Sequence, residues 1–214
     1  MSNSEKINTK ATAFIRDRYQ RLSPKYDRMV EGSERRYIPW RKDLWSKVNG
    51  PRILEVGVGT GRNMPYYPSG QQIVAIDLTP GMLANAKIRA DSLDLNVDLR
   101  LGDVQSLEFS DNSFDTAIAT FVFCSVPDPV AGFLELKRVV KPHGQIHVLE
   151  HMRSPTPLLG VLMDILNPLS VWFWGDHINH RTIEDIHEAG LVIERITNQA
   201  MGGIFKQLEL TVEK

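Results

Sequence analysis

Three glycines at alternate positions, Gly57, Gly59 and Gly61, follow directly on a short apolar run that ends at Val56. Because glycine lacks a Cβ atom, a turn built from it lets the backbone touch a bound ligand closely. The dinucleotide-binding fingerprint needs its third glycine one position later, where this chain has Arg62. The loop is therefore predicted to bind a ligand other than a pyrophosphate.

Two carboxylates follow at positions where a nucleoside could be held. Asp77 ends the next apolar run, 20 positions after Gly57, and a carboxylate there can accept hydrogen bonds from both hydroxyls of a ribose. Gly102 and Asp103 follow a third run, and the Asp103 carboxylate is suited to accept from an exocyclic amine. Each acid has an alternative interpretation as a helix cap or a surface charge. Together the three loops favour an adenosine without a diphosphate.

These residues fall at the ends of short apolar runs that alternate with helical segments from residue 52 onward, a pattern that predicts βαβ units and a parallel sheet. Strands are expected over residues 52–56, 72–77, 97–101, 114–120, 145–150, 191–197 and 204–212. The apolar residues of the last strand share one parity, which is typical of an antiparallel strand at a sheet edge. We predict an α/β, Rossmann-like fold with a seven-stranded mixed sheet, its last strand antiparallel, and helices on both faces. Ligands bind such sheets at the carboxyl ends of the strands.

Residues 1–50 are expected to form a helical extension or lid, and residues 51–214 the ligand-binding domain. Helices are predicted over residues 10–22 and 33–48, with Pro39 bending or restarting the second. The extension carries 12 lysine and arginine residues against 6 acidic ones, and the rest of the chain 13 against 20. Such a basic segment favours an anionic membrane surface or is a solvated helical face. No nucleic-acid-binding signature is present, so nucleic acid is not an expected partner.

The chain resembles the class I S-adenosylmethionine-dependent methyltransferases. The resemblance rests on residues 54–61, Asp77, residues 102–103 and residues 114–115, and it is strongest over roughly residues 50–150. It implies S-adenosylmethionine as the cofactor and S-adenosylhomocysteine as the product. A nicotinamide dehydrogenase is the alternative from another reaction class, and Arg62 disfavours it.

The resemblance also implies roles for individual residues. Glu55 would support the cofactor's ammonium group indirectly, Asp77 would bind its ribose, and Asp103 would bind its adenine amine. Other implied cofactor-site residues are Gly57, Gly59 and Gly61 at the methionine part, Gly102 beside Asp103, Leu78, Met82 and Val104 around the adenine, and Thr120 and Phe121 beside the sulfonium.

Shorter motifs narrow the resemblance. Tyr19 and the pair Tyr26-Asp27 are similar to an N-terminal segment of the ubiquinone and menaquinone C-methyltransferases and the bacterial phosphatidylethanolamine N-methyltransferases. Residues 123–129, 149–155 and 175–182 resemble the alkyl-thiol methyltransferase-like proteins, although Asp176 stands where many members have cysteine. In these groups the N-terminal segment folds over the cofactor. The resemblance thus implies that Tyr19 and Tyr26 belong to the cofactor site, the alternative being two core tyrosines.

Residues 155–175 are unusually apolar: twelve of the 21 are large and apolar, and Asp164 is the only charged residue. Leu158, Val161, Leu162, Ile165, Leu166 and Leu169 recur at helical spacing. Pro155, Pro157 and Pro168 break the segment, so it is not expected to cross a membrane. Residues 155–181 are interpreted as an acceptor-side insertion. Its helix either packs on the sheet as a lid or presents an apolar surface to a lipid-like acceptor and the bilayer.

All four tryptophans, Trp40, Trp45, Trp172 and Trp174, lie in the basic extension or in this insertion. Tryptophan favours boundaries between apolar and wet regions, which supports the second interpretation. We therefore expect an apolar or amphipathic small-molecule or lipid acceptor, with the amine head group of phosphatidylethanolamine as the first hypothesis. The alternatives are methylation of a hydrophobic thiol or quinol precursor, and a membrane-associated protein that binds the cofactor without turnover.

The candidate catalytic residues are His151, Tyr26 and Asp176, and His177 and His180 are further candidate bases. For any one of them a structural role is the alternative. An amine acceptor must lose a proton before attack, a thiol must become a thiolate, and a quinol carbon needs a general base.

No metal site is predicted, because no cluster of carboxylates or thiolates accompanies the histidine pairs along the chain. The single cysteine, Cys124, is interpreted as a small buried residue. One cysteine and no apolar run at the N-terminus predict a cytoplasmic protein. Peripheral contact with the inner membrane face remains an open alternative.

Overall fold

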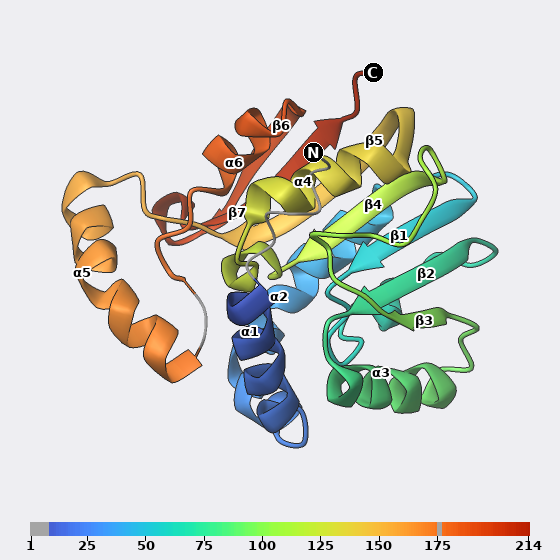
Figure 1. The fold of residues 1–214 in the computed structure, drawn as a ribbon, viewed down its shortest axis with the longest axis horizontal. Coiled ribbons are helices and arrows are strands. Elements are labelled where there is room, and N and C mark those ends of the chain that lie inside the picture. Colours follow the sequence, from blue (N-terminus) through green and yellow to red (C-terminus); the bar gives the residue numbers. More distant parts are fainter. Residues whose placement is uncertain (1–8, 175–176) are drawn as a thin grey trace.

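A seven-stranded sheet forms the centre of the computed structural model, which describes residues 9–174 and 177–214 (Figure 1). The strand order is β3-β2-β1-β4-β5-β7-β6. The strands are β1 (Arg52–Val56), β2 (Gln72–Asp77), β3 (Asp98–Leu101), β4 (Phe114–Thr120), β5 (Val140–His151), β6 (Val192–Ala200) and β7 (Phe205–Thr211). Strand β7 pairs antiparallel with β5 and β6, whereas the other pairs are parallel. The predicted mixed sheet is confirmed.

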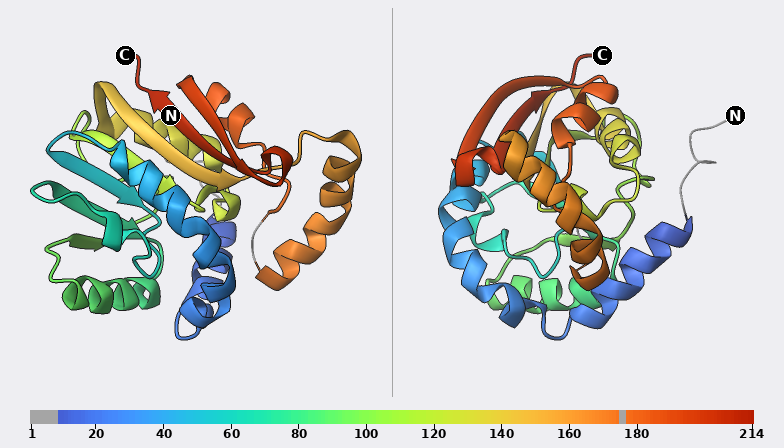
Figure 2. Two further views of the ribbon diagram at one scale, coloured as in Figure 1. Left: turned by 180° about the vertical axis from the view of Figure 1, so that it is seen from behind. Right: turned by 90° about the vertical axis from the view of Figure 1, so that its left-hand side faces the viewer.

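Helices cover both faces of this sheet (Figures 1 and 2). They are α1 (Thr9–Leu22), α2 (Tyr26–Ser46), α3 (Pro80–Ser92), α4 (Pro129–Val139), α5 (Pro157–Trp174) and α6 (Thr182–Glu188), with short 3₁₀ turns η2 (Met64–Tyr66), η3 (Phe123–Ser125) and η4 (Met201–Gly203). The second helix begins earlier than predicted, at Tyr26, and continues through Pro39 without restarting. Its buried Trp40, Leu44 and Trp45 hold the segment after the proline against the sheet.

The two faces of the sheet receive alternate residues of each strand. On one face Ile53, Ile73, Ile118 and Leu149 pack with Trp40, Leu44 and Trp45 of α2, and Ala75 packs with Ala86 and Ala90 of α3. On the other face Leu54, Val74, Ala117 and Val148 pack with Phe133 and Leu136 of α4 and Ile186 of α6. Because both faces of the sheet are covered, the central strands are apolar along most of their length. These apolar runs are the pattern from which the strands were predicted.

Some element boundaries differ from those predicted. Helix α4 ends at Val139, and the neighbouring Val140 already pairs with Phe114 as the first residue of β5. Strand β5 therefore begins five residues earlier than expected, with an irregular register between Phe114 and Thr116. Thr79 precedes α3 at the position of a capping residue, but its side chain makes no capping hydrogen bond. Its backbone N–H donates to the Asp77 carboxylate instead.

Helix α1 contains no buried residue and lies at the carboxyl edge of the sheet (Figure 1). Polar contacts join it to the domain. Gln105 Nε2 donates to Thr12 Oγ1 at 3.2 Å, the Gly81 N–H donates to Gln20 Oε1 at 2.9 Å, and Asn85 Nδ2 donates to the Ser23 carbonyl at 2.8 Å, just beyond the helix. Helix α1 is thus attached to the surface of the domain, whereas α2 contributes buried side chains to the core.

Helix α5 projects from the rest of the molecule (Figures 1 and 2). The helix that the apolar spacing predicts is present, and Pro168 lies inside it without ending it. Its apolar stripe is exposed, so this stripe does not pack on the sheet; the exposed fractions are Leu158 83%, Val161 51%, Leu162 47%, Ile165 69%, Leu166 43% and Leu169 53%. Among the described residues, no helix combines the length and apolarity needed to cross a bilayer.

Phe133→Ala tests the helix layer formed by α4. The Phe133 ring is fully buried and stacks on Phe123, with the ring centroids 3.8 Å apart. We expect this truncation to lower the free energy of unfolding by about 3–5 kcal/mol in urea denaturation. Leu158→Ala, at the exposed end of α5, is the control and should change it by less than about 0.5 kcal/mol. Similar losses in both variants would contradict this assignment of burial.

Candidate active site

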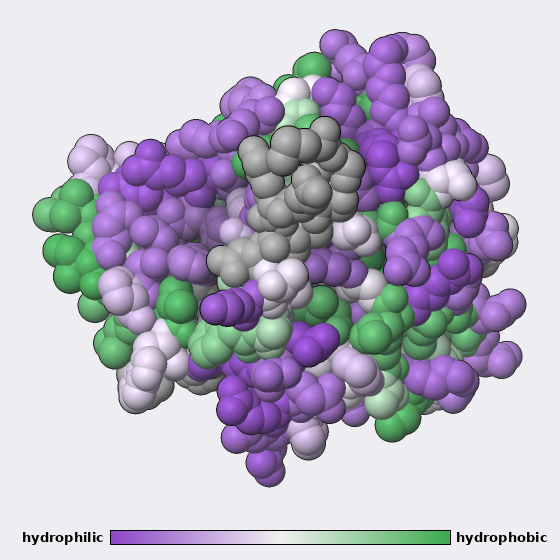
Figure 3. Space-filling view, in the orientation of Figure 1, coloured by the Kyte–Doolittle hydropathy of each residue, from purple (hydrophilic) through white to green (hydrophobic). Residues whose placement is uncertain are grey.

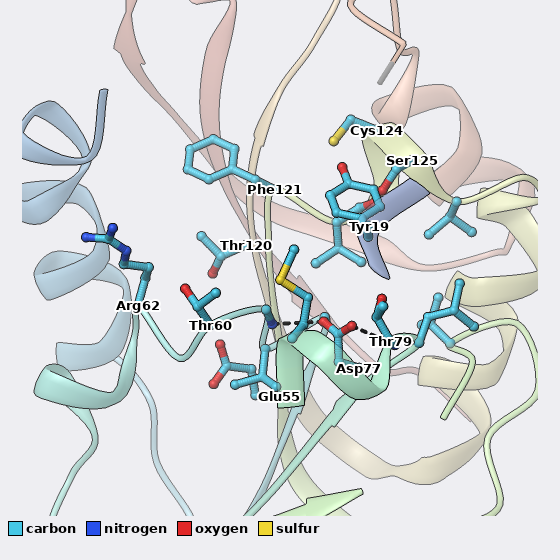
Figure 4. A pocket seen from close by; sticks show the side chains of 18 of the residues that line it. Tyr19, Glu55, Thr60, Arg62, Asp77, Thr79, Thr120, Phe121, Cys124 and Ser125 are labelled. Atoms are coloured by element: carbon cyan, nitrogen blue, oxygen red, sulfur yellow. Dashed lines mark hydrogen bonds between the residues drawn. The ribbon is translucent and has the colours of Figure 1, made fainter. Parts of the chain in front are cut away.

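A cavity opens where β1, β2, β4 and β5 end, beside helices α1 and α2 (Figure 4). It brings together most of the residues that the sequence predicts for the cofactor site. Those lining it are Tyr19, Tyr26, Glu55, Gly57, Gly59, Asp77, Leu78, Met82, Gly102, Asp103, Val104, Thr120 and Phe121, together with the catalytic candidate His151. Gly61 does not line the cavity, and Asp176 lies outside the described residues.

The three glycines of the loop after β1 have different surroundings. All have positive φ angles, of 64° at Gly57, 56° at Gly59 and 81° at Gly61. A Cβ atom on Gly57 would lie 2.4 Å from Val122, and one on Gly61 would lie 2.7 Å from the sulfur of Met64. A Cβ atom on Gly59 would meet nothing within 4 Å. Gly57 and Gly61 therefore allow tight packing around the loop, while Gly59 leaves open space at the cavity wall.

The Asp77 carboxylate connects two of the loops. One oxygen accepts from the Gly59 N–H at 2.9 Å and the other from the Thr79 N–H at 2.9 Å. Burial raises the pKa of Asp77, and these backbone hydrogen bonds oppose the rise. Each carboxylate oxygen has a second lone pair, so ribose hydroxyls can still donate to a carboxylate held in this way.

Glu55 belongs to a buried polar network. Its carboxylate accepts from Asn63 Nδ2 at 2.6 Å and from the Tyr67 hydroxyl. Asn63 in turn accepts from Arg41 Nη1 at 2.8 Å and donates to Thr120 Oγ1 at 3.0 Å. Burial raises the pKa of Glu55 to about 7, and burial together with Glu55 raises that of Tyr67. Spacing along the chain did not reveal that Arg41 and Asn63 join this network.

Asp103 is tied to Gln105 on the opposite wall of the cavity. Asp103 accepts from the Gln105 backbone N–H at 2.9 Å and from the Gln105 side chain, which also donates to Thr12 of α1. The nearby apolar Met82 and Val104 are buried. This part of the cavity combines a carboxylate with apolar walls, an arrangement that suits an adenine with its exocyclic amine.

The start of α2 is fastened to the glycine loop through Asp27. Its carboxylate accepts from Thr60 Oγ1, from Arg62 Nε at 3.0 Å and from Arg89. Although burial alone would raise the pKa of Asp27, the hydrogen bond from Thr60 and the charges of Arg89 and Arg62 lower it. Tyr26 precedes this anchor and lies 6.3 Å from Tyr19, measured between ring centroids. The lid role predicted for these tyrosines remains a prediction.

Phe121 has a backbone conformation that is rare for an aromatic residue. Its φ angle is 56°, directly after β4, and its N–H donates to the Leu149 carbonyl at 2.8 Å. Its ring lies 4.7 Å from that of Tyr37, between centroids, and the Arg41 guanidinium lies 5.4 Å from its centre. Such strain persists only where surrounding contacts enforce it, and it is common at functional sites.

Reactive side chains that the sequence analysis did not bring together lie at the far end of the cavity. Figure 4 shows Cys124 across the cavity from Glu55 and Asp77. Cys124, Glu150 and His151 each offer one potential metal ligand, and these ligand atoms all lie within 4.8 Å of one another. The Cys124 carbonyl accepts from the His177 N–H at 2.9 Å. Burial lowers the pKa of the nearby His180 to about 4.

The model of a methyltransferase domain matches residues 54–148, the segment that contributes all the strand-end loops described above except His151. Residues 54–148 thus form a methyltransferase domain, and the chain has the fold of solved S-adenosylmethionine-dependent methyltransferases. A solved S-adenosylmethionine-dependent methyltransferase from Thermotoga maritima superposes with a TM-score of 0.70 at 20% identity, covering 91% of this chain and 98% of that one. At this level of identity the superposition shows that the two proteins share a fold.

Curated relatives of this methyltransferase have different acceptors in their names. Phosphatidylethanolamine N-methyltransferase of Cereibacter sphaeroides is 36% identical over 117 residues, or 53% of this chain and 58% of that protein. Demethylmenaquinone methyltransferase of Renibacterium salmoninarum is 36% identical over 134 residues, 60% and 55% of the two chains. Thiol S-methyltransferase TMT1B of Rattus norvegicus is 29% identical over 176 residues, 78% and 71%. The chain thus spans little more than half the length of the first two relatives.

The cavity suits S-adenosylmethionine, which is the cofactor of this family. Gly59 leaves open space for the close approach of a ligand, and the Asp77 and Asp103 carboxylates stand at the ends of neighbouring strands. Glu55, Asn63 and Arg41 provide a hydrogen-bonded polar wall on the other side. Carboxylates paired with apolar walls fit a nucleoside that bears an amino-acid tail, as the sequence predicted.

Asp77→Ala tests the ribose assignment. The substitution removes a buried carboxylate, and we expect affinity for S-adenosylmethionine to fall by about 1–3 kcal/mol in calorimetric titration, the range for a charge-assisted hydrogen bond. Asp98→Ala, at the half-buried start of β3 and outside the cavity lining, is the matched control and should leave affinity unchanged. Unaltered binding by Asp77→Ala would mean that the ribose is held elsewhere.

Glu55→Gln tests the consequence of the raised pKa. Folded Glu55 keeps its proton up to about pH 7, whereas the unfolded chain loses it near the ordinary value of 4.5. The folded state therefore binds more protons at Glu55 between these values, so the contribution of Glu55 to the free energy of unfolding should fall as the pH rises from about 5 to 7, on the order of a few kcal/mol, while the lowered pKa of His180 acts in the opposite sense.

The Glu55→Gln variant should lose this fall in urea denaturation followed across that pH range. Glu108→Gln, at an exposed position, should retain it. The same pH dependence in wild type and Glu55→Gln would assign the titration to another group.

Proposed function

We propose that this methyltransferase modifies an amphipathic acceptor at a membrane surface, with the amine head group of phosphatidylethanolamine as that acceptor. The observation that carries the proposal is the orientation of α5. A helix of a soluble domain normally turns its apolar stripe inward. Here Ile165 and Trp172, one heptad apart on the stripe, are each 69% exposed.

The inward side of α5 is attached by polar groups instead. Arg153 forms a two-pronged ion pair with Asp164, with distances of 2.8 to 3.1 Å, and Asn179 donates to the same carboxylate at 3.1 Å. One turn further on, Asn167 accepts from the Ile178 N–H at 3.0 Å. Polar contacts thus fix the helix with its apolar side outward. In Figure 3, apolar residues gather on the outer edge of the molecule over α5.

The charge distribution supports the same partner. Helix α1 lies at the same edge of the sheet as α5, and α2 leads from that edge onto one face of the sheet (Figures 1 and 2). The exposed basic residues of α1, of α2 and of the turn between them include Lys10, Arg16, Arg21, Lys25, Arg28, Arg35, Arg36 and Lys42. Basic side chains next to exposed apolar residues favour anionic lipid surfaces, each cation near the surface contributing about 1 kcal/mol.

Described residues that follow α5 in the chain contact the wall of the cavity. His177 contacts the Cys124 carbonyl in the cavity wall, and the Arg153 N–H donates to the His180 carbonyl at 2.8 Å. We infer from this proximity that a lipid whose chains lie along α5 extends its head group toward the cavity. This route relies on apolar contact for the tail and on the cavity residues for the head group.

Methyl transfer to an amine requires mainly that the reacting groups are aligned and that a proton acceptor is available. When bound, S-adenosylmethionine supplies a methyl group on an activated sulfonium. The enclosing walls exclude water and hold the acceptor in line, which contributes up to about 7–11 kcal/mol in favourable systems. Partial burial lowers the pKa of an ammonium group and so favours the nucleophilic amine. His151, at the end of β5 in the cavity wall, is the proposed acceptor of the released proton.

Turnover with defined vesicles tests the acceptor. S-adenosylhomocysteine should form with vesicles containing phosphatidylethanolamine, and not with vesicles of phosphatidylcholine alone, whose amine is already fully methylated. Short-chain thiols and demethylated quinols form the comparison arms. Product with a thiol or quinol but not with the amine lipid would contradict phosphatidylethanolamine as the acceptor and identify the thiol or quinol instead. Tight cofactor binding without product in any arm would contradict the proposed enzymatic activity.

The double variant Ile165→Ser/Trp172→Ser tests the membrane surface. Removing two exposed apolar side chains from α5 should reduce the fraction of protein that sediments with anionic vesicles by at least about tenfold, because roughly 1.5–3 kcal/mol is lost for each large apolar side chain that no longer buries. Ile88→Ser is the matched control, since Ile88 is 68% exposed but lies on α3. Cofactor affinity should be unchanged in both variants. Equal sedimentation of the double variant and wild type would rule out α5 as the contact.

A further inference from the structure

A mixed group of metal-ligating side chains, none of them assigned to the cofactor, lies at the cavity wall. Cys124 belongs to η3, just after β4, and Glu150 and His151 are the last two residues of β5. Strands β4 and β5 pair in parallel, so their carboxyl ends bring these side chains together. The three potential ligand atoms lie within 4.8 Å of one another.

The donor set is that of a borderline-soft divalent ion. A cysteine sulfur, a histidine nitrogen and a carboxylate oxygen are the ligand types that proteins use for Zn²⁺. Around a tetrahedral Zn²⁺ such donor atoms stand about 3.5 Å apart, as bond lengths of about 2.0–2.3 Å require. Movements on the order of 1 Å would therefore bring the three atoms into coordination, within reach of side-chain rotation.

Two of the ligands are already held in place by the backbone. One Glu150 oxygen accepts from the Val122 N–H at 2.6 Å and from the Phe123 N–H at 2.8 Å. Glu150 itself is completely buried, and Cys124 is 3% exposed. The Cys124 carbonyl accepts from His177, which fixes the turn from the other side. Ligands of metal sites in proteins are held by hydrogen bonds of this kind.

The open side of the group faces the cavity. Cys124 and His151 line it, whereas Glu150 lies behind them. Three protein ligands with a fourth position left to solvent or substrate are typical of catalytic rather than structural zinc sites. We propose that Cys124, Glu150 and His151 bind one divalent metal ion of the Zn²⁺ type, with its free coordination position directed into the acceptor end of the cavity.

Metal binding at this site does not depend on which acceptor is methylated. The free position suits a sulfur, nitrogen or oxygen atom of an acceptor, or a water molecule. A metal ion at this site would bind the imidazole of His151. His151 can therefore either bind the ion or accept the released proton, but not both at once.

Cobalt titration provides a direct test, because Cys124 is the only cysteine in the chain. Any sulfur-to-cobalt charge-transfer band in the near ultraviolet must therefore report on Cys124. The full-length protein, freed of metal with a chelator, should take up one Co²⁺ per chain with such a band, and Zn²⁺ should displace it. Elemental analysis of the Zn²⁺-loaded protein should give one ion per chain.

Single substitutions separate the site from adventitious binding. Cys124→Ala and His151→Ala should each weaken Zn²⁺ binding at least about tenfold, and Cys124→Ala should abolish the charge-transfer band. His187→Ala, which removes an exposed histidine on α6, is the matched control and should bind like wild type. Retained affinity for S-adenosylmethionine shows that each variant is folded.

Two results would overturn the proposal. One is a wild-type protein without the charge-transfer band at saturating Co²⁺. The other is Zn²⁺ affinity that is equal in wild type, Cys124→Ala and His151→Ala. Either result leaves the vesicle assay unaffected, so failure of the metal site is distinguishable from failure of the proposed function.

Discussion

Buried carboxylates that accept backbone N–H groups from a neighbouring loop hold the carboxyl edge of this sheet together. Asp77, at the end of β2, accepts from Gly59 in the loop after β1. Glu150, near the end of β5, accepts from Val122 and Phe123 in the loop after β4. Unpaired ions would be costly in these places, so each carboxylate fixes the loop that satisfies it. The cavity keeps its shape through these pairs, one at the cofactor end and one at the acceptor end.

Helix α5 reverses the arrangement found in the rest of the molecule. In the layers that cover the sheet the core side chains face inward, and Phe133 and Leu44 are fully enclosed. On α5 the ion pair between Asp164 and Arg153 faces the domain, and the apolar stripe faces away. Repeated spacing of apolar residues predicts a helix but does not say which neighbour its stripe will meet. Only the placement of Asp164 and Asn167 against the following segment decides the orientation.

The sequence was informative wherever the chemistry is local to a strand end. The alternate glycines after β1, Asp77 after β2 and Asp103 after β3 all line or support the cavity as predicted, because parallel strands place their carboxyl ends side by side. Contacts between distant segments could not be predicted in this way.

Those distant contacts depend on strand order and on helix packing. The pairing of Asp27 with Arg62 and Arg89 depends on how α2 meets the glycine loop. Cys124 meets His151 only because β4 and β5 are neighbours in the sheet. Residue types alone do not specify these arrangements.

The surface attachment of α1 has a consequence for exchange of ligands during repeated reaction cycles. Because α1 has no fully buried side chain and is held to the domain partly by hydrogen bonds such as those of Thr12 and Gln20, its departure would expose less apolar area than that of α2, whose Leu44 and Trp45 are buried. Water can replace each broken contact at small net cost. Detachment of α1 would open the part of the cavity wall that Tyr19 lines while the core of the sheet stays intact, so release of spent cofactor by that route would not require global unfolding.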